Sequence, residues 1–223
     1  MRDFITCLEF LTRVRFSKRT DWRDEDFSRS VPYFPLVGLV IGFLLAAVNY
    51  SLFYIETPLF LRVTLLLLAE IIITGGLMYD GFMDTADGVF SARSRERMLE
   101  IMKDSHVGSN AVLAIIILLL LKIAAYLELS GETLTWVLLT MSVATRTFMV
   151  VFIVNFPYAR KEGIGHMFTK YAKPFYTYIA FAVCAGIIAA CGLQYLAVAG
   201  ICFTVTLIIA QYRSEEHTSE LQS

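Results

Sequence analysis

Three aspartates, Asp80, Asp84 and Asp87, lie close together in the sequence, directly after a long apolar run. Their spacing of i, i+4 and i+7 would place all three carboxylates on one face of a helix. Carboxylates that converge in this way repel one another unless a divalent cation neutralises them, and oxygen ligands without His or Cys favour Mg²⁺ or Mn²⁺. Since Mg²⁺ commonly takes substrate phosphate oxygens as further ligands, the pattern predicts a metal site for a phosphate ester or diphosphate.

Small residues surround these aspartates and leave room for a bulky substrate or a second backbone: Gly75, Gly76, Gly81 and Gly88. The alternative interpretation is a solvated helix end, because single aspartates are common near membrane surfaces. Three aspartates on one face among glycines favour the metal site.

A basic segment follows the aspartates. Ser94 is predicted to cap a short amphipathic helix whose apolar stripe is Met98, Ile101 and Met102. On the cytoplasmic leaflet such a helix either binds anionic lipid head groups or brings its basic residues to a phosphate. Phosphate binding is favoured for the residues that follow it, where the chain turns back toward the membrane: Lys103, Asp104 and Ser105.

The element that positions these residues is predicted to be membrane-embedded. The chain of 223 residues is 57% hydrophobic and only 17% charged, against about 25% charged in a soluble domain, and its mean hydropathy is +0.64. We predict an all-α, polytopic membrane helix bundle with about six transmembrane spans, forming one domain over residues 1 to 212. The apolar windows long enough to cross a bilayer are 34 to 54, 59 to 77, 111 to 129, 134 to 154, 175 to 192 and 195 to 212.

Basic residues alternate between the connections of these windows. Lys and Arg are frequent before residue 30, at 93 to 103 and at 160 to 173, whereas the connections around 55 to 58 and 130 to 133 have none. The positive-inside rule then places the N-terminus and the aspartates on the cytoplasmic side, and we expect a multi-pass protein of the bacterial inner membrane. A cleaved signal peptide is not expected, because no continuous apolar core precedes Val31.

Three ionisable residues fall inside apolar windows: Glu70, Lys122 and Arg146. Charges at this depth need partners or must reach an interface. Glu70 is predicted to be able to pair with either cation, and a substrate contact is an equal alternative.

Residues 213 to 223, RSEEHTSELQS, are polar and lack periodicity. They look like the translation of a sequencing-library adapter. We therefore expect an artefactual tail and exclude it from the fold and the site.

Several stretches resemble one known family. "GGLMYDGFMDTADG" and "RMLEIMKDSHVG" are similar to the central signature of the cobalamin synthases, also called adenosylcobinamide-GDP ribazoletransferases. "FLTRVRF", "FPLVGLVIG" and "YARKEGIGHMF" resemble the family's start, first span and third cytoplasmic loop, so the likeness runs from about Phe4 to Tyr212. The chain departs from the pattern at Met78, Tyr79, Arg15 and His106, and we expect the family's C-terminal segment to be missing.

The resemblance implies a transferase of cobalamin biosynthesis. In the implied reaction, the phosphoryl group of adenosylcobinamide-GDP passes to a ribose hydroxyl of α-ribazole or its 5′-phosphate. The products are adenosylcobalamin or its 5′-phosphate, and GMP. Membrane lipid is the other expected partner, no nucleic acid is expected, and the oligomeric state stays open.

Roles follow for the residues around the aspartates, which would hold Mg²⁺, or Mn²⁺, against the diphosphate. Lys103, with Arg93 and Arg13, would neutralise charge as GMP leaves, since phosphoryl transfer depends on positioning and electrostatics. Asp104 or one of the cluster carboxylates would accept the proton of the attacking hydroxyl. Ser105 would bond a phosphate oxygen or only cap the turn.

Other classes fit parts of the pattern. A membrane-embedded aromatic prenyltransferase also uses Asp-rich Mg²⁺ motifs, but generally two on separate helices, and one is visible here. A secondary transporter would explain the spans and the intramembrane charges, but predicts internal repeats and polar groups at the midplane. A CDP-alcohol phosphotransferase ranks below both, because its motif has a different Asp spacing.

Overall fold

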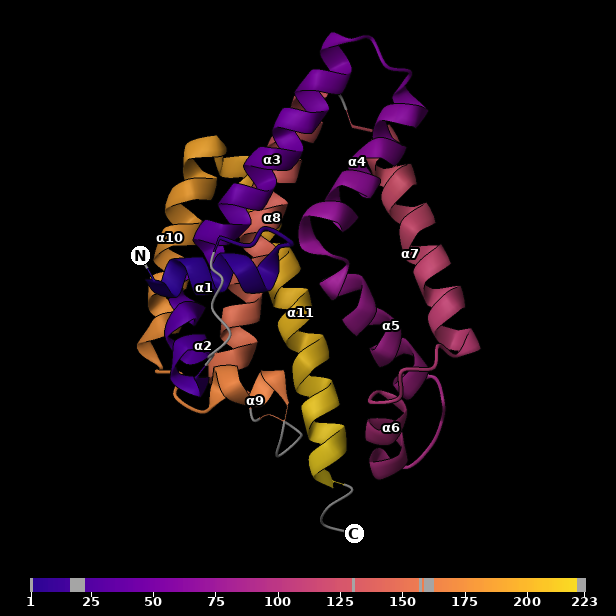
Figure 1. Ribbon diagram of the computed structural model, residues 1–223, viewed down its shortest axis with the longest axis vertical. Helices are drawn as coiled ribbons and strands as arrows, with labels where there is room; N and C mark the ends of the chain where they lie inside the picture. The colour runs from indigo at the N-terminus through magenta and orange to yellow at the C-terminus, as the bar shows by residue number, and fades with distance from the viewer. Residues whose placement is uncertain (1, 17–22, 130, 157, 159–162, 220–223) are drawn as a thin grey trace.

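Figure 1 shows the computed structural model of the chain, whose regular structure is entirely helical within the described residues. The structure describes residues 2–16, 23–129, 131–156, 158 and 163–219, with side chains as far as residue 211. The predicted all-α class is therefore confirmed.

The helices follow one another along the chain, with a short 3-10 turn, η1, between the second and the third. Their bounds are α1 (Arg2–Leu11), α2 (Asp24–Ser30), η1 (Val31–Tyr33), α3 (Phe34–Tyr54), α4 (Leu59–Thr74), α5 (Leu77–Val89), α6 (Arg95–Ile101), α7 (Ser109–Leu127), α8 (Gly131–Asn155), α9 (Ile164–Thr169), α10 (Phe175–Cys191) and α11 (Leu193–Ser219).

Fewer helices than predicted are long and apolar enough to cross a membrane. Within the described residues, these are the continuous run 24–54 that contains α3, then α7, α8 and the first part of α11. Helices α4 and α5 together make a fifth candidate, although they are bent by 93° at their junction. Helix α10 has 17 residues, which makes it about 26 Å long and places it at the short limit for a span. The structure thus supports a multi-pass bundle with four or five candidate spans and α10 as a shorter apolar helix, and the count of about six stays a prediction.

The bend between α4 and α5 is made by two glycines. Gly75 ends α4 with a φ of +68° and Gly76 precedes α5 with a φ of +73°. L-residues avoid this left-handed region because their Cβ approaches the backbone, whereas glycine enters it freely. The window 59 to 77 therefore stops at Thr74, and the aspartates begin a new helix in a different direction.

The two best-packed spans, α3 and α8, touch through their backbones. A Cβ on Gly38 would lie 2.5 Å from the carbonyl oxygen of Ser142, and one on Gly42 would lie 2.7 Å from the Cα of Leu139. Small residues one turn apart allow such close approach in membrane helices, where dispersion contacts replace a hydrophobic driving force. Fully buried apolar residues surround this contact, among them Val37, Ile41, Leu45, Leu134 and Leu138.

The basic segments share one end of the bundle. Figure 1 places α6 and α9 at its lower end and the α3–α4 connection at its upper end. The start of α8 lies with that upper connection, because a Cβ on Gly131 would be 3.7 Å from the ring of Phe53. This arrangement agrees with the alternation of charge in the sequence, whereas the cytoplasmic assignment of the lower end stays a prediction.

Helices α1, α2 and α9 pack together beside the bundle. The ring of Phe168 on α9 lies 4.7 Å from that of Phe10 on α1 and 5.3 Å from that of Phe27 on α2, centroid to centroid. The hydroxyl of Ser28 donates to the carbonyl of Met167 at 2.7 Å. These contacts hold the segment after α1, which carries Arg13, against the bundle.

Candidate functional site

Helix α5 carries the three aspartates, so the helical backbone on which their predicted common face depends is confirmed. Their environments differ along the helix. Asp80 in the first turn is exposed, Asp84 is half-buried, and Asp87 near the C-terminal end is buried at 9% exposure. The three carboxylates therefore differ in their exposure to solvent.

Asp87 binds the start of helix α7. Its Oδ2 accepts the backbone N–H of Gly108 at 2.6 Å, and its Oδ1 accepts that of Ala111 at 2.8 Å. The first N–H groups of a helix lack partners within it and form its positive end, so a carboxylate there satisfies and neutralises them. Asp87 on α5 thus caps the N-terminus of α7, although α6 lies between these two helices in the sequence.

This arrangement differs from the predicted convergence of three carboxylates. Among the residues that the structure describes, no three His, Cys, Asp or Glu side chains are grouped closely enough to hold a metal ion. The physical reason for Asp87 is the competing demand of the α7 N-terminus, whose N–H groups occupy both of its carboxylate oxygens. Metal binding by Asp80, Asp84 and Asp87 stays a prediction.

Asp80 and Asp84 still suit Mg²⁺. They are separated by one turn of α5, and Gly81 between them faces open space, since a Cβ there would meet nothing within 4 Å. Mg²⁺ is usually bound by one or two carboxylates, with waters and substrate phosphates as the other ligands. Two carboxylates one turn apart are therefore a sufficient protein contribution.

The predicted amphipathic helix after the aspartates is confirmed as α6, with Ser94 at the N-cap position but without a capping hydrogen bond from its side chain. Its methionines pack on the end of α5. A Cβ on Gly88 would lie 2.5 Å from the Cε of Met102 and 3.1 Å from the Cγ of Met98. Gly88 therefore allows α6 to approach α5 closely.

The loop from α6 to α7 carries Lys103, Asp104 and Ser105, all exposed. Because Asp87 holds the end of this loop at Gly108, the three residues lie beside the C-terminal end of α5. Asp104 accepts hydrogen bonds from the His106 backbone at 3.0 Å and from its ring Nδ1 at 2.6 Å. The side-chain bond lowers the pKa of Asp104 and raises the pKa of His106, so Asp104 is a weaker base than an unpaired aspartate.

The two predicted arginines lie at different places along α5. Arg13 packs over the glycine bend at its start, where a Cβ on Gly75 would be 2.6 Å from the Arg13 Nε, and its backbone N–H donates to Ile73 at 2.8 Å. Arg93 is exposed in the connection to α6. Helix α5 has 13 residues and is therefore about 20 Å long. The predicted phosphate ligands thus flank the aspartates at both ends and do not form one cluster.

A buried polar network adjoins the first turn of α5. Lys122 on α7 donates from Nζ to Glu70 Oε2 on α4 at 2.6 Å and to the Tyr79 hydroxyl oxygen at 3.0 Å. Its ammonium also lies 5.4 Å from the centre of the Tyr79 ring and 5.8 Å from that of Tyr126. Of the two partners that the sequence left open for Glu70, the structure selects Lys122. This network ties α4, α5 and α7 together next to Asp80.

Arg146 on α8 is buried, at 7% exposure. One terminal nitrogen donates to the hydroxyl of Thr145 at 3.0 Å, and its Nε has no hydrogen-bond partner within the described residues. Its guanidinium lies close enough to Glu70 and Tyr79 to interact with both electrostatically. Arg146 therefore brings a second cation to the network beside the first turn of α5.

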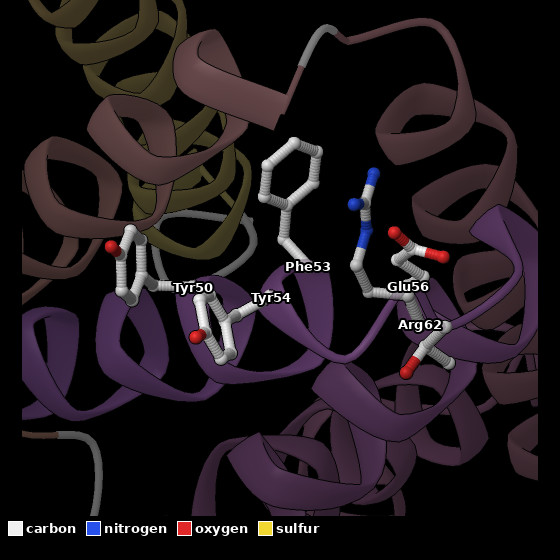
Figure 2. A pocket seen from close by; sticks show the side chains of 6 residues that line it. Tyr50, Phe53, Tyr54, Glu56 and Arg62 are labelled. Carbon is white, nitrogen blue, oxygen red and sulfur yellow. The ribbon is translucent and has the colours of Figure 1, made fainter.

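The sequence reasoning missed Arg62, which lies at the opposite end of the bundle. Its side chain is buried next to Phe53 in the cavity that Figure 2 shows. A signal existed, because Arg62 falls inside the apolar window 59 to 77, where a charge is costly. The same rule identified Glu70, Lys122 and Arg146.

The comparisons with known proteins that find a match all identify the same family. Residues 3–218 match the family model described as cobalamin-5-phosphate synthase. The chain is similar to the adenosylcobinamide-GDP ribazoletransferase of Clostridium novyi (strain NT), with 39% identity over 186 residues, which are 82% of this chain and 73% of the relative. The enzyme of the same name from Desulforamulus reducens is 39% identical over 207 residues, 92% of this chain and 82% of the relative.

A third relative of that name, from Desulfitobacterium hafniense (strain Y51), is 40% identical over 176 residues, 78% of this chain and 69% of the relative. No solved structure matches the chain. The family match extends to residue 218 and α11 to Ser219, both within the segment for which an artefactual tail stays a prediction.

Proposed function

This chain belongs to the cobalamin-5-phosphate synthase family, and from that membership we propose that it is the enzyme that joins adenosylcobinamide-GDP to ribazole. The family match over residues 3–218 is the observation that carries the proposal. A ribose hydroxyl of ribazole, or of its 5′-phosphate, attacks the phosphorus atom on the cobinamide side of the diphosphate. The bond from that phosphorus to the bridging oxygen breaks, GMP leaves with the electron pair, and the hydroxyl proton passes to a base.

Asp80 and Asp84 are the residues that would hold Mg²⁺. Asp80 is exposed and Asp84 is half-buried, and the two carboxylates offer hard oxygen donors one turn apart on α5. Mg²⁺ bound there would screen the charge of the diphosphate. Asp87 contributes indirectly, because its hydrogen bonds hold the loop that carries Lys103 against α5.

The cations around α5 bind the phosphate oxygens and stabilise negative charge on the leaving GMP. Lys103 approaches from the end of α5 near the loop, and Arg13 approaches from the glycine bend. Arg93, exposed in the next connection, is a further ligand for the nucleotide. Because these residues are separated along a helix of about 20 Å, they suit an extended diphosphate ester better than a single phosphate ion.

Asp104 is the proposed proton acceptor, with Ser105 beside it as a hydrogen-bond donor to a phosphate oxygen. The bond from His106 keeps Asp104 ionised, which suits the acceptor role at neutral pH but weakens the base. The site faces the cytoplasm in this proposal, because the basic segments gather at the same end of the bundle as α6 and α9 (Figure 1).

The test is release of GMP from adenosylcobinamide-GDP by the full chain in detergent or lipid, with ribazole and with its 5′-phosphate. Asp80→Asn and Asp84→Asn are each expected to lower the rate roughly 100-fold or more, as losing one electrostatic partner of a transition state does. Chelation of Mg²⁺ is expected to lower it similarly in the unaltered chain.

Glu96→Gln is the matched control, since it also replaces an exposed carboxylate by an amide, on α6. Its rate is expected to stay near that of the unaltered chain. Near-normal GMP release by Asp84→Asn, or by the chelated enzyme, would refute the metal role. Absence of GMP release from the unaltered chain with either acceptor would refute the proposed reaction.

A further inference from the structure

A cavity of about 560 Å³ lies at the end of the α3–α4 hairpin. This end is opposite to α6 and α9 in Figure 1. Figure 2 shows its lining side chains, which come from the last turns of α3, the connecting turn and the first turn of α4: Tyr50, Phe53, Tyr54, Glu56, Thr57 and Arg62. None of these residues takes part in the site proposed around α5.

Arg62 is the buried charge of this cavity. It is 7% exposed, and its Nε has no hydrogen-bond partner within the described residues. Its guanidinium carbon lies 5.3 Å from the centre of the Phe53 ring, which holds the group in place without satisfying its N–H donors. A buried cation with an unused donor favours an anionic ligand, and a planar guanidinium suits the oxygens of a phosphate.

Glu56 supplies the opposite charge in the same cavity. It stands in the connecting turn with a φ of +54°, in the left-handed region that residues other than glycine seldom adopt. The turn is closed by hydrogen bonds from the Glu56 backbone N–H to Phe53 at 3.0 Å and from that of Thr57 to Leu52 at 3.0 Å. In Figure 2 the carboxylate of Glu56 and the guanidinium of Arg62 extend on the same side of the hairpin. The cavity therefore offers one cationic and one anionic group to a ligand.

The rim of the cavity is aromatic and exposed, with Tyr50 at 67% and Tyr54 at 77% exposure. Tyrosines at the end of a membrane span lie at the level of the lipid head groups, where one side is apolar and the other is wet. A ligand reaching Arg62 and Glu56 at this level would have an apolar part beside these rings.

We propose that this cavity binds the head group of a membrane phospholipid that carries both a phosphate and an ammonium. The phosphate lies on Arg62 and the ammonium lies on Glu56. The acyl chains leave along the exposed aromatic rim. The site is independent of the transferase reaction, since its residues lie at the other end of the bundle.

The test is native mass spectrometry of the detergent-solubilised full chain, titrated separately with phosphatidylethanolamine and with phosphatidylglycerol. Both lipids present a phosphate, but only the first carries an ammonium. One saturable phosphatidylethanolamine is expected, bound at least fivefold more tightly than phosphatidylglycerol. Equal affinities for the two lipids in the unaltered chain would overturn the proposal.

Three variants test whether the lipid binds at Arg62 and Glu56. Arg62→Leu is expected to weaken phosphatidylethanolamine binding at least tenfold, and Glu56→Gln is expected to bring the two lipids within twofold of each other. Arg29→Leu, which removes an exposed arginine at the other end of the bundle, is the matched control and should change neither value. Unchanged binding by Arg62→Leu would overturn the proposal, and if that variant fails to fold, the exposed Glu56→Gln decides by itself.

A competition with free phosphoethanolamine separates a lipid from a soluble ligand. The free head group is expected to displace the lipid only at a concentration at least 100-fold higher, because it lacks the chains that lie along Tyr50 and Tyr54. Displacement at equal concentration would assign the cavity to a soluble phosphate ester and overturn the lipid assignment.

Discussion

The carboxylate of Asp87 on α5 accepts the backbone N–H of Gly108 at 2.6 Å, across the loop that separates α5 from α7. A Cβ on Gly108 would lie 2.5 Å from the same carboxylate, so the contact needs both residue types. This pair joins the helix of the aspartates to the loop of Lys103, Asp104 and Ser105. It explains how residues on both sides of α6 come to lie around one end of α5.

Asp87→Asn is expected to destabilise the protein, whereas Asp80→Asn is not. The amide of asparagine loses the charge and one of the two acceptor oxygens that meet the N–H groups of Gly108 and Ala111. Losing hydrogen bonds at a helix N-terminus costs about 1 to 3 kcal/mol. Thermal unfolding in detergent measures the difference, and equal midpoints for the two variants would contradict the capping role.

Gly108→Ala and Gly81→Ala form a second matched pair. The first places a methyl group against the carboxylate of Asp87, and its φ of −86° means that the cost is steric and not conformational. The second adds a methyl group that meets nothing within 4 Å in a helix, where alanine is favoured over glycine by about 1 kcal/mol. We expect Gly108→Ala to lower the unfolding midpoint and Gly81→Ala to raise it or leave it unchanged. The same thermal scan decides, and an equal drop for both variants would contradict a specific steric role of the Gly108 contact with Asp87.

Glu70 and Lys122 are expected to be coupled inside the bundle. Their side chains are 14% and 19% exposed and their charged atoms are 2.6 Å apart. Removing one partner leaves the charge of the other buried without its ion pair, which costs about 3 kcal/mol or more, whereas removing both leaves neither member of this pair without its partner. The double variant Glu70→Gln/Lys122→Met should therefore be destabilised by less than the sum of the two single variants, Glu70→Gln and Lys122→Met. A double-mutant cycle of unfolding free energies that is additive would show that the pair is not coupled.

The pKa of His106 is expected to be above its ordinary value of 6.5, chiefly because its ring donates a hydrogen bond to Asp104. Because the pKa of His106 is raised in the folded loop, the hydrogen bond stabilises the loop fully at pH values below the ordinary pKa. This stabilisation is lost as the pH rises through the raised pKa. Asp104 stays ionised over this window, because the same bond lowers its pKa. An NMR titration of the His106 ring checks the value, and Asp104→Asn should return it toward 6.5. An identical titration curve in that variant would contradict the hydrogen bond.

The sequence was most informative where one local property decides the structure. Apolar length predicted helices α3, α7 and α8 within a few residues, and the spacing of Met98 and Met102 predicted α6. The bend near the end of the window 59 to 77 was not predicted, although Gly75 and Gly76 were noted, because a positive φ at both depends on what the surrounding helices allow. The family membership, which the signature indicated, is confirmed by the match over residues 3–218.

By itself, the sequence determined that the chain is a helical membrane protein of this family, because hydropathy and a long signature are properties of neighbouring residues. The tertiary structure decided what each charged group contacts. Asp87 was predicted as a metal ligand and is found at the start of α7, and Glu70 was left with two possible partners and is found with Lys122. Helical spacing defines a face but not its neighbour, and only packing brings together groups that are 24 or 52 positions apart.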